Sequence, residues 1–307
     1  MSPAVEWLLQ ELGRLDPDDS MLREAEKQVQ AQGWVLVASA NEGVLPLALN
    51  LRASCRKVGV ADPLFYCFDE CTRVALEKIG VFARELGING VENNYQLYGS
   101  PKFRDICVWR LLPLLYLLEQ GLPVLSVDVD VAFLRNPLSS LPTGKDVIGQ
   151  YGGKSREGFV RGEMDLCMGL VGFPNPSTGQ SFLQGVMEKL RFHRDQPYYH
   201  DQSAANELLR EEEASFSVTL LEPLAYPNGA IFQEAIVTGE MTETPFLVHA
   251  NYLSLREEKI DLLDRADGWS VGIPSEVRKW RWKQRFKALT LVSRLAAIRR
   301  SCLGRDG

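Results

Sequence analysis

Short apolar segments alternate with longer amphipathic ones in the first part of this chain, and no other sequence feature constrains its fold as much. The apolar segments 33–43, 63–70 and 122–134 have the length and composition of buried strands. The segments between them show the apolar spacing of helices, including one over 71–87 and a long apolar one over 100–121 in which Pro113 can introduce a kink. Strands that alternate with helices form a right-handed, mostly parallel α/β sheet, whose ligands collect outside the carboxyl ends of the strands. We therefore expect an α/β fold with its site at that edge.

The second half of the chain is richer in glycine and less regular. It contains a strand pattern at 166–173, two helical patterns, and further strand patterns at 216–221 and 245–250. No segment has the Pro, Ser or charge content of a linker. We therefore predict a single domain over residues 33–275, preceded by a helical extension over residues 1–32.

Composition and charge restrict the class of protein. The 307 residues are 45% hydrophobic and 24% charged, as in soluble globular proteins. The net charge of −6 combines −14 over residues 1–275 with +8 over residues 276–307. The acidic body argues against a nucleic-acid-binding surface. With no signal peptide and no membrane-length apolar stretch in the sequence, we expect a soluble protein, cytoplasmic or, if an upstream anchor is missing, in the secretory lumen.

Residues 276–307 read as a separate basic amphipathic helix, with ten Lys and Arg against two acids. Such a helix can lie on an anionic membrane surface, which would give the protein a peripheral membrane contact. It can equally pack against the acidic body, and both interpretations stay open.

The segment "VLSVDVDVAFLRNPL", residues 124–138, places Asp128 and Asp130 inside an apolar run. Buried carboxylates are costly unless they are paired. Since side chains alternate along a strand, we expect both aspartates on one face. Two carboxylates at a strand end form a hard-oxygen site that suits Mg²⁺ or Mn²⁺. The alternative is one salt-bridged acid beside one loop acid.

Three segments carry a resemblance to a known family. They are "GLPVLSVDVDVAFLRNPL" at 121–138, "YHDQSAANELL" at 199–209 and "FLVHANYLSLREEKIDLL" at 246–263. In this order and spacing they resemble the DxD strand, the Asp-Gln helix start and the late His-Ala-Asn segment of the nucleotide-diphospho-sugar transferase family. The resemblance covers roughly residues 33–270. It implies a Rossmann-like GT-A fold with a mixed, mostly parallel sheet flanked by helices.

The resemblance implies a role for the aspartate pair and for a distant histidine. In the family the DxD aspartates hold a cation that bridges the donor's diphosphate, which makes Asp128 and Asp130 ligands of Mn²⁺ (or Mg²⁺) and of the donor. It also makes His249 the third protein ligand of the metal and brings Asn251 close to the donor. Taken alone, His249 would read as a hydrogen-bonded core histidine. Cys167 stands where the family commonly has Asn, which implies a different donor choice or weaker activity.

Further residues take their expected roles from the same resemblance. Asp201 and Gln202 are expected as the catalytic pair, with Asp201 at the donor sugar and Gln202 at the reacting face. A plain N-cap is the alternative for Asp201. Arg110 is expected to pair with the diphosphate or with the DxD acids, or else to be a solvated helix cation. Ala40 and Asn41, at the end of the first strand, are expected beside the nucleoside.

These expectations combine into a metal-dependent glycosyltransferase. It would move a hexose or pentose from a nucleotide-sugar donor, expected to be UDP-linked, to a hydroxyl of a glycan, protein or small molecule, with retention. Two alternatives stay open. One is a catalytically silent relative that binds a nucleotide-sugar or glycan. The other is a haloacid-dehalogenase-type phosphatase, which also has Asp-x-Asp after an apolar strand but needs a later acidic pair at a strand end. The late acids Asp261, Asp264 and Asp267 instead lie in a helical pattern.

Overall fold

The computed structural model describes residues 19–86, 94–142, 144–196, 198–211 and 216–284. The chain divides into two compact units, residues 1–271 and 272–307. In the second unit residues 275–284 are helical, and the rest of the predicted basic helix lies outside the described residues. The predicted limits of the N-terminal extension, the main domain and the C-terminal helix stay predictions. The sheets and the cleft described below lie in the first unit.

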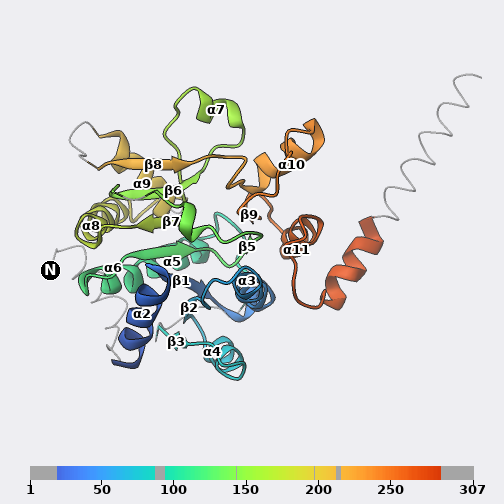
Figure 1. Cartoon of the computed structure of the whole chain (residues 1–307), viewed down its shortest axis with the longest axis horizontal. Coiled ribbons are helices and arrows are strands. Elements are labelled where there is room, and N and C mark those ends of the chain that lie inside the picture. The colour runs from blue at the N-terminus through green and yellow to red at the C-terminus, as the bar shows by residue number, and fades with distance from the viewer. Residues whose placement is uncertain (1–18, 87–93, 143, 197, 212–215, 285–307) are drawn as a thin grey trace, which may run out of the picture. The chain divides into compact units, whose positions relative to one another are not determined.

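A seven-stranded mixed sheet forms the centre of this unit (Figure 1). Its spatial order is β3-β2-β1-β4-β7-β6-β8, and β7 is the strand that runs antiparallel to both of its neighbours. The other pairs are parallel, so the expected mixed, mostly parallel sheet is confirmed. The strands are β1 (Val35–Ala40), β2 (Leu64–Cys67), β3 (Ala83–Glu85), β4 (Val124–Val127), β6 (Val147–Tyr151), β7 (Leu166–Phe173) and β8 (Val218–Leu221).

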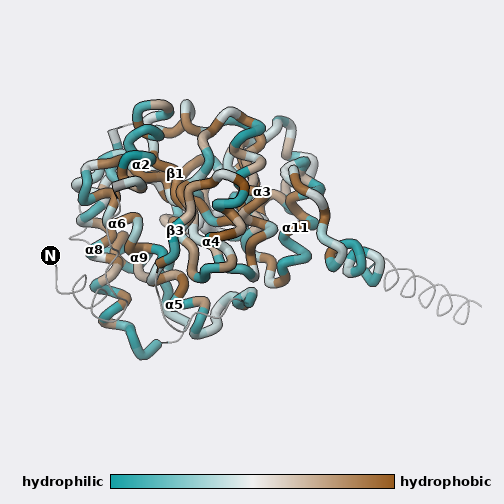
Figure 2. Tube along the Cα trace, turned by 90° about the horizontal axis from the view of Figure 1, so that it is seen from below, coloured by the Kyte–Doolittle hydropathy of each residue, from teal (hydrophilic) through white to brown (hydrophobic). Residues whose placement is uncertain are grey.

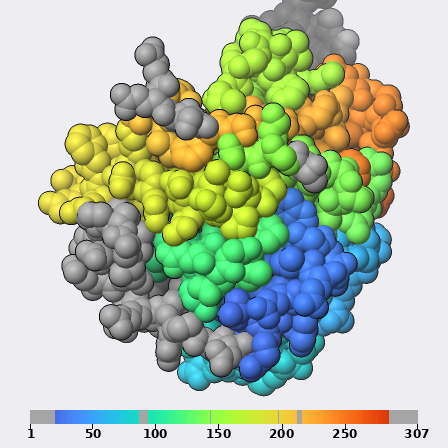
Figure 3. Space-filling model, turned by 60° about the vertical axis from the view of Figure 1, so that its left-hand side comes forward, coloured from blue at the N-terminus to red at the C-terminus, as the bar shows by residue number. Residues whose placement is uncertain are grey.

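Helices cover both faces of the sheet. On one face α2, α6, α8 and α9 contribute to a single hydrophobic core, in which α6 packs against α8. In Figure 3 the yellow region of the chain that contains α8 borders the green region that contains α6. On the other face α3 packs against β1. Figure 2, in which the Cα tube is coloured by residue hydropathy, shows hydrophobic residues around β1 and hydrophilic residues on parts of the outer helices. The helices are α2 (Asp19–Gln32), α3 (Leu45–Lys57), α4 (Glu70–Glu77), α5 (Pro101–Trp109), α6 (Leu111–Glu119), α7 (Arg156–Val160), α8 (Pro176–Phe192), α9 (Asp201–Arg210), α10 (Gly229–Thr238) and α11 (Arg256–Arg265), with 3-10 turns at Glu42–Val44 and Leu138–Ser140.

None of the helices in the described ranges combines the length and the apolar character needed to cross a bilayer.

A second, two-stranded sheet accounts for the main departure from the sequence prediction. The apolar segment 122–134 was expected as one strand, but it divides into β4 and β5 (Val131–Phe133). Strand β5 leaves the central sheet and pairs antiparallel with β9 (Leu247–His249). Another departure is the short strand β3, which replaces the end of a helix predicted over residues 71–87.

The apolar helix predicted over residues 100–121 is broken in two. Helix α5 ends at Trp109 and α6 begins at Leu111, with Arg110 between them. Pro113 has no backbone N–H, and its ring clashes with the carbonyl four residues earlier, which belongs to Trp109. The break at Arg110 is therefore the consequence of Pro113.

Helix α9 is attached to β7 by one buried amide. Asn206 is 5% exposed, and its side chain accepts from the Leu166 N–H at 2.7 Å and donates to the Leu166 carbonyl at 2.9 Å. It also donates to the carbonyl of Gln202 at 2.9 Å. This amide fixes the position of α9 relative to the sheet.

The first prediction concerns this attachment. Asn206→Ala is expected to lower the free energy of unfolding by about 3 kcal/mol, because it leaves both polar groups of the Leu166 backbone without their partner. Urea denaturation measures the change. The half-buried neighbour Ser203→Ala on the same helix is the control, with an expected change of about 0.5 kcal/mol or less. Equal losses in the two variants would contradict the assigned role of Asn206.

Candidate metal site and cleft

Asp128 and Asp130 lie in the turn between β4 and β5, at the edge of the central sheet. The Asp128 N–H donates to the Gly169 carbonyl at 2.7 Å, which keeps the start of the turn beside β7. The register of the small sheet pairs Val131 with His249, and the Ala250 N–H donates to the Asp130 carbonyl at 2.9 Å. The pairing of β5 with β9 thus brings a histidine from the end of the domain to the aspartate pair.

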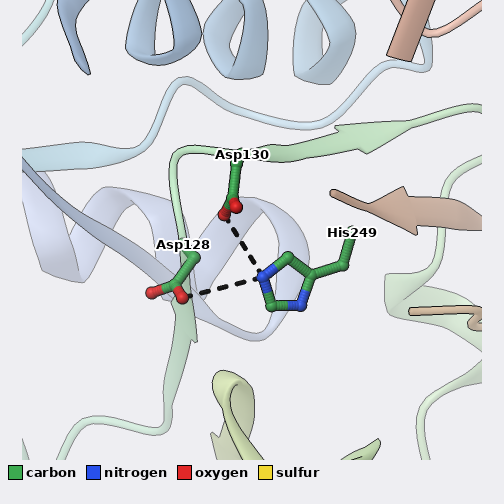
Figure 4. Close-up of side chains that lie close together, drawn as sticks. All are labelled: Asp128, Asp130 and His249. Atoms are coloured by element: carbon green, nitrogen blue, oxygen red, sulfur yellow. Dashed lines mark ion pairs between the residues drawn. The ribbon is translucent and has the colours of Figure 1, made fainter. Parts of the chain in front are cut away.

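Figure 4 shows the three side chains pointing toward one another. The Nε2 atom of His249 lies 3.2 Å from Oδ1 of Asp130 and 3.7 Å from Oδ2 of Asp128. One ligand atom from each residue lies within 4.8 Å of the others. Asp130 and His249 are buried, while the Asp128 side chain is 34% exposed. Two carboxylates and an imidazole at this spacing can hold a divalent cation.

The imidazole of His249 is held in an orientation that suits a metal ligand. Its Nδ1 lies 2.7 Å from Oε1 of Gln150, an oxygen that can only accept, so Nδ1 carries a proton. The Gln150 amide is itself fixed, since its nitrogen donates to the Tyr226 carbonyl at 3.0 Å. The buried Nε2 faces the aspartates at ion-pair distance, and among the described residues it has no partner with hydrogen-bond geometry. Burial disfavours the imidazolium, but the Asp130 carboxylate raises the pKa of His249 to about 10 in the absence of a cation.

Space for an ion is kept open by a glycine on β7. A Cβ atom at Gly169 would lie 2.4 Å from Cε1 of His249 and 2.5 Å from Oδ2 of Asp128. Any side chain there would therefore push two of the three ligands apart. Together with the unpartnered Nε2 of His249, this clearance shows that the residues present fit a bound cation.

Two largely buried basic side chains, Lys259 and Arg110, contact the carboxylates of Asp130 and Asp128. The Lys259 ammonium on α11 lies 2.5 Å from Oδ2 of Asp130, and the Arg110 guanidinium contacts Asp128. Burial would raise the pKa of Asp130, but Lys259 and His249 hold it well below its usual range. Arg110 thus contacts a DxD acid, which is one of the alternatives expected from the sequence. The nearby Arg104 on α5 instead donates to the Tyr199 carbonyl at 2.9 Å.

The first turn of α9 is tied to the same arginine. Nε of Arg110 donates to Oδ2 of Asp201 at 2.8 Å, and Oδ1 of Asp201 accepts from the Gln202 N–H at 2.8 Å. Asp201 is 1% exposed, and although burial opposes its ionisation, Arg110 lowers the pKa of Asp201 to about 2. His200 lies next to it, with Nδ1 3.4 Å from Oδ1 of Asp201. The carboxylate therefore connects α9 to the helix break at Arg110.

One cleft of about 450 Å³ is bordered by the three candidate metal ligands, by Arg110 and Lys259, and by Asp201. Ala40 and Asn41 line it at the end of β1, and Asn41 donates to the Asn94 carbonyl at 3.0 Å. Asn251 lines it after β9 and accepts from the Gly229 N–H at 2.9 Å. The residues predicted for the site that line this cleft are Ala40, Asn41, Arg110, Asp128, Asp130, Asp201, Gln202, His249 and Asn251.

Several residues of the site had no role predicted from the sequence. Gln150 is a lone amide inside an apolar strand. Lys259 lies among acidic residues on a helix that also carries Arg256 and Arg265. Both signals were present in the sequence. The reason given for the aspartate pair was wrong, because Asp128 and Asp130 converge through a turn and not through strand alternation. The late acids Asp261 and Asp264 lie on α11, which is not the strand end that a phosphatase site requires.

Comparison with known proteins identifies a family. The model of the nucleotide-diphospho-sugar transferase family matches residues 59–263, about two thirds of the chain. The comparison with curated proteins finds no match.

Several solved structures are similar in fold. The apo structure of the bifunctional glycosyltransferase WbbM is 11% identical over 75% of this chain and 49% of that one, with a TM-score of 0.49. The glycosyltransferase GlyE of Streptococcus pneumoniae TIGR4 is 12% identical over 82% and 64%, with a TM-score of 0.47. An active-site mutant of LgtC is 16% identical over 79% and 98%, with a TM-score of 0.49. The chain therefore spans about half the length of the WbbM chain.

The second prediction tests the clearance at Gly169. Gly169→Ala is expected to weaken Mn²⁺ binding by at least about tenfold, because the new methyl group displaces His249 and Asp128. Isothermal titration calorimetry measures the affinity. Gly172→Ala on the same strand is the control, since its Cβ would crowd the Ile148 side chain at 2.8 Å and not the site. If both variants bind Mn²⁺ like the wild type, the ion does not occupy this position.

The third prediction tests the orientation of His249. Gln150→Ala removes the acceptor for the Nδ1 proton, and we expect Mn²⁺ affinity to fall by about 10- to 100-fold, the usual cost of losing the partner of a metal-bound histidine. Gln150→Glu keeps an acceptor at this position and is expected to retain most of the affinity. An equal loss in both variants, measured by the same calorimetry, would contradict this role.

Proposed function

This chain belongs to the nucleotide-diphospho-sugar transferase family, and from that membership we propose that it moves a sugar from a nucleoside-diphosphate donor, UDP-linked, to an acceptor hydroxyl with retention. The observation that carries the proposal is the convergence of Asp128, Asp130 and the unpartnered Nε2 of His249 on one open position at the edge of a cleft. A diphosphate needs a cation at such a position, because its departure leaves negative charge behind.

The proposed cofactor is Mn²⁺ (or Mg²⁺), held by Asp128, Asp130 and His249. When bound, the ion supplies Lewis-acid neutralisation of the charge that develops on the departing nucleoside diphosphate. Lys259 keeps Asp130 ionised, and Arg110 orients Asp128 and opposes the rise that burial causes in the pKa of Asp128, so the carboxylate oxygens are ready to act as ligands. The two basic side chains therefore hold the carboxylates ready for the cation, and Arg110 would also lie beside the diphosphate.

The nucleoside end of the donor is proposed to lie at the end of β1. Ala40 and Asn41 are almost fully buried and yet line the cleft, which suits recognition through backbone groups and a fixed amide. Asn251 lines the cleft beyond the metal position, where the sugar would follow the diphosphate. Ligands of α/β sheets collect in this way outside the carboxyl ends of the strands.

The sugar end is proposed to lie at the start of α9. Gln202 lines the cleft with its amide, and we place that amide at the face of the reacting carbon. The carboxylate of Asp201 is committed to Arg110 and to the N–H of Gln202, which supports a role in positioning Gln202 and the donor sugar. Because Gln202 is already positioned, less conformational entropy is lost when the donor sugar and the enzyme reach the reactive geometry.

Retention is supported by the state of the carboxylates. The acids that line the cleft among the described residues are Asp128, Asp130 and Asp201, and each is engaged by Arg110 or Lys259. None of them is free to take the proton of the acceptor hydroxyl, as an inverting displacement would require of a general base, and none is free to attack the sugar as a nucleophile. In the proposed step the bond between the anomeric carbon and the phosphate oxygen breaks, the acceptor oxygen bonds to that carbon on the same face, and its proton passes to the departing phosphate.

The fourth prediction tests this function directly. With Mn²⁺ and a panel of UDP-sugars, the wild type is expected to release UDP, and Asp130→Ala to lower the rate by at least about 100-fold because the cation loses a central ligand. A coupled assay for UDP measures the rate. Asp195→Ala, whose side chain is 94% exposed, is the control and is expected to match the wild type.

Other outcomes of the same assay favour the alternatives. Tight UDP binding without turnover, across a panel of acceptors, would identify a silent binding protein and contradict catalysis. Release of phosphate from monoesters would support a phosphatase. An Asp130→Ala variant as active as the wild type would contradict a metal-dependent reaction at this site.

A further inference from the structure

An exposed tyrosine stands at the edge of the cleft that holds the metal site. Tyr98 is 69% exposed, and it lines the same cleft as Asp128 and Gln202. Large exposed aromatic rings are unfavourable in water, and where they border a cleft they commonly mark a binding surface. The mechanism proposed above gives Tyr98 no role.

The Tyr98 ring is held in place although it is exposed. Its hydroxyl lies 3.0 Å from Nε2 of His200, and the two rings meet edge to face at 5.5 Å. The ring of Phe103 lies 5.1 Å away on α5. Because these partners fix the ring before any ligand arrives, binding to it loses little side-chain entropy.

A second exposed ring lies beside Gly99, the residue that follows Tyr98. Tyr198 is 75% exposed, and a Cβ atom added at Gly99 would lie 3.5 Å from its Cδ1 atom. Leu97, on the other side of Tyr98 in the sequence, is 54% exposed. We call Leu97, Tyr98 and Tyr198 the aromatic rim. It is an apolar surface beside the polar groups of His200.

The position of the aromatic rim separates it from the nucleoside end of the cleft. Tyr98 contacts His200, which directly precedes Asp201 at the start of α9. The proposed nucleoside position, at the end of β1, is instead bordered by Tyr95, which packs against Gly43. The rim therefore lies on the side of the cleft where Gln202 faces the reacting carbon.

We propose that the acceptor is a carbohydrate, and that a sugar ring of this acceptor stacks on Tyr98. The inference rests on the proposed function and names its acceptor class. The C–H groups on one face of a pyranose carry partial positive charge and match the negative face of an aromatic ring. The hydroxyls at its edge match the polar groups beside the rim.

The experiment separates acceptor binding from donor binding. UDP release is measured with a donor that the wild type hydrolyses, alone and with free oligosaccharides that end in glucose, galactose, mannose, xylose, fucose or N-acetylglucosamine. At least one saccharide is expected to stimulate release. For that saccharide, Tyr98→Ala is expected to raise KM by about tenfold, and KM for the donor by less than about twofold. Tyr98→Phe keeps the ring and is expected to lie between wild type and Tyr98→Ala.

The control is Phe192→Ala, because Phe192 is 82% exposed but does not line the cleft. It is expected to leave KM for the saccharide unchanged. Saturation-transfer NMR with the same saccharides gives a second readout, in which the Tyr98→Ala variant is expected to lose signal at sugar ring protons. Thermal melting of each variant shows whether its fold is intact.

Several results would overturn the proposal. If donor hydrolysis occurs but neither assay detects a saccharide, the acceptor is not a carbohydrate, and stimulation by hydroxyl-bearing peptides would identify the other class. If Tyr98→Ala raises KM for the donor as much as for the saccharide, the ring serves the donor. If the wild type neither binds nor hydrolyses any nucleotide-sugar, the proposed function itself has failed, while saccharide binding seen by NMR would still test the rim.

Discussion

The two aspartates in the turn at the edge of the central sheet can remain charged because a cationic side chain contacts each of them. Arg110 contacts Asp128, and Lys259 contacts Asp130 at 2.5 Å. Unpaired carboxylates would be too costly at this depth, and a carboxylate that lost its partner would destabilise the protein strongly. The arrangement also holds two ligand groups ionised and aimed at one point. Stability and the capacity to bind a metal therefore depend on the same two ion pairs.

The two basic side chains come from helical segments: Arg110 lies at the break between α5 and α6, and Lys259 lies on α11. Arg110 occupies the break that Pro113 imposes on an apolar helix, so its side chain can reach Asp128 on one side and Asp201 on the other. Lys259 comes from α11, one of the last helices of the domain. Since Asp201 begins α9, a single guanidinium connects the metal ligand to the helix proposed to hold the donor sugar.

The sequence allowed prediction of the sheet class, because apolar periodicity and the strand–helix alternation are local properties. It also indicated the aspartate pair and, through the resemblance, His249. It did not reveal that β5 leaves the central sheet, because a single apolar run gives no sign of a change of sheet. Gln150 was visible as a lone amide in an apolar strand, but its partner His249 lies 99 positions away and could not be identified from local sequence. The role of Gly169 depends in the same way on distant neighbours.

The small β5–β9 sheet has a consequence for how the protein acquires its site. Asp130 and His249 are separated by more than 100 positions of sequence, and only the pairing of these two short strands joins them. Contacts of such long range form late in folding because loop closure must come first. A cation would therefore find its full ligand set only in the finished domain. It would act as a ligand that stabilises the native state, and not as a nucleus that guides the chain toward it.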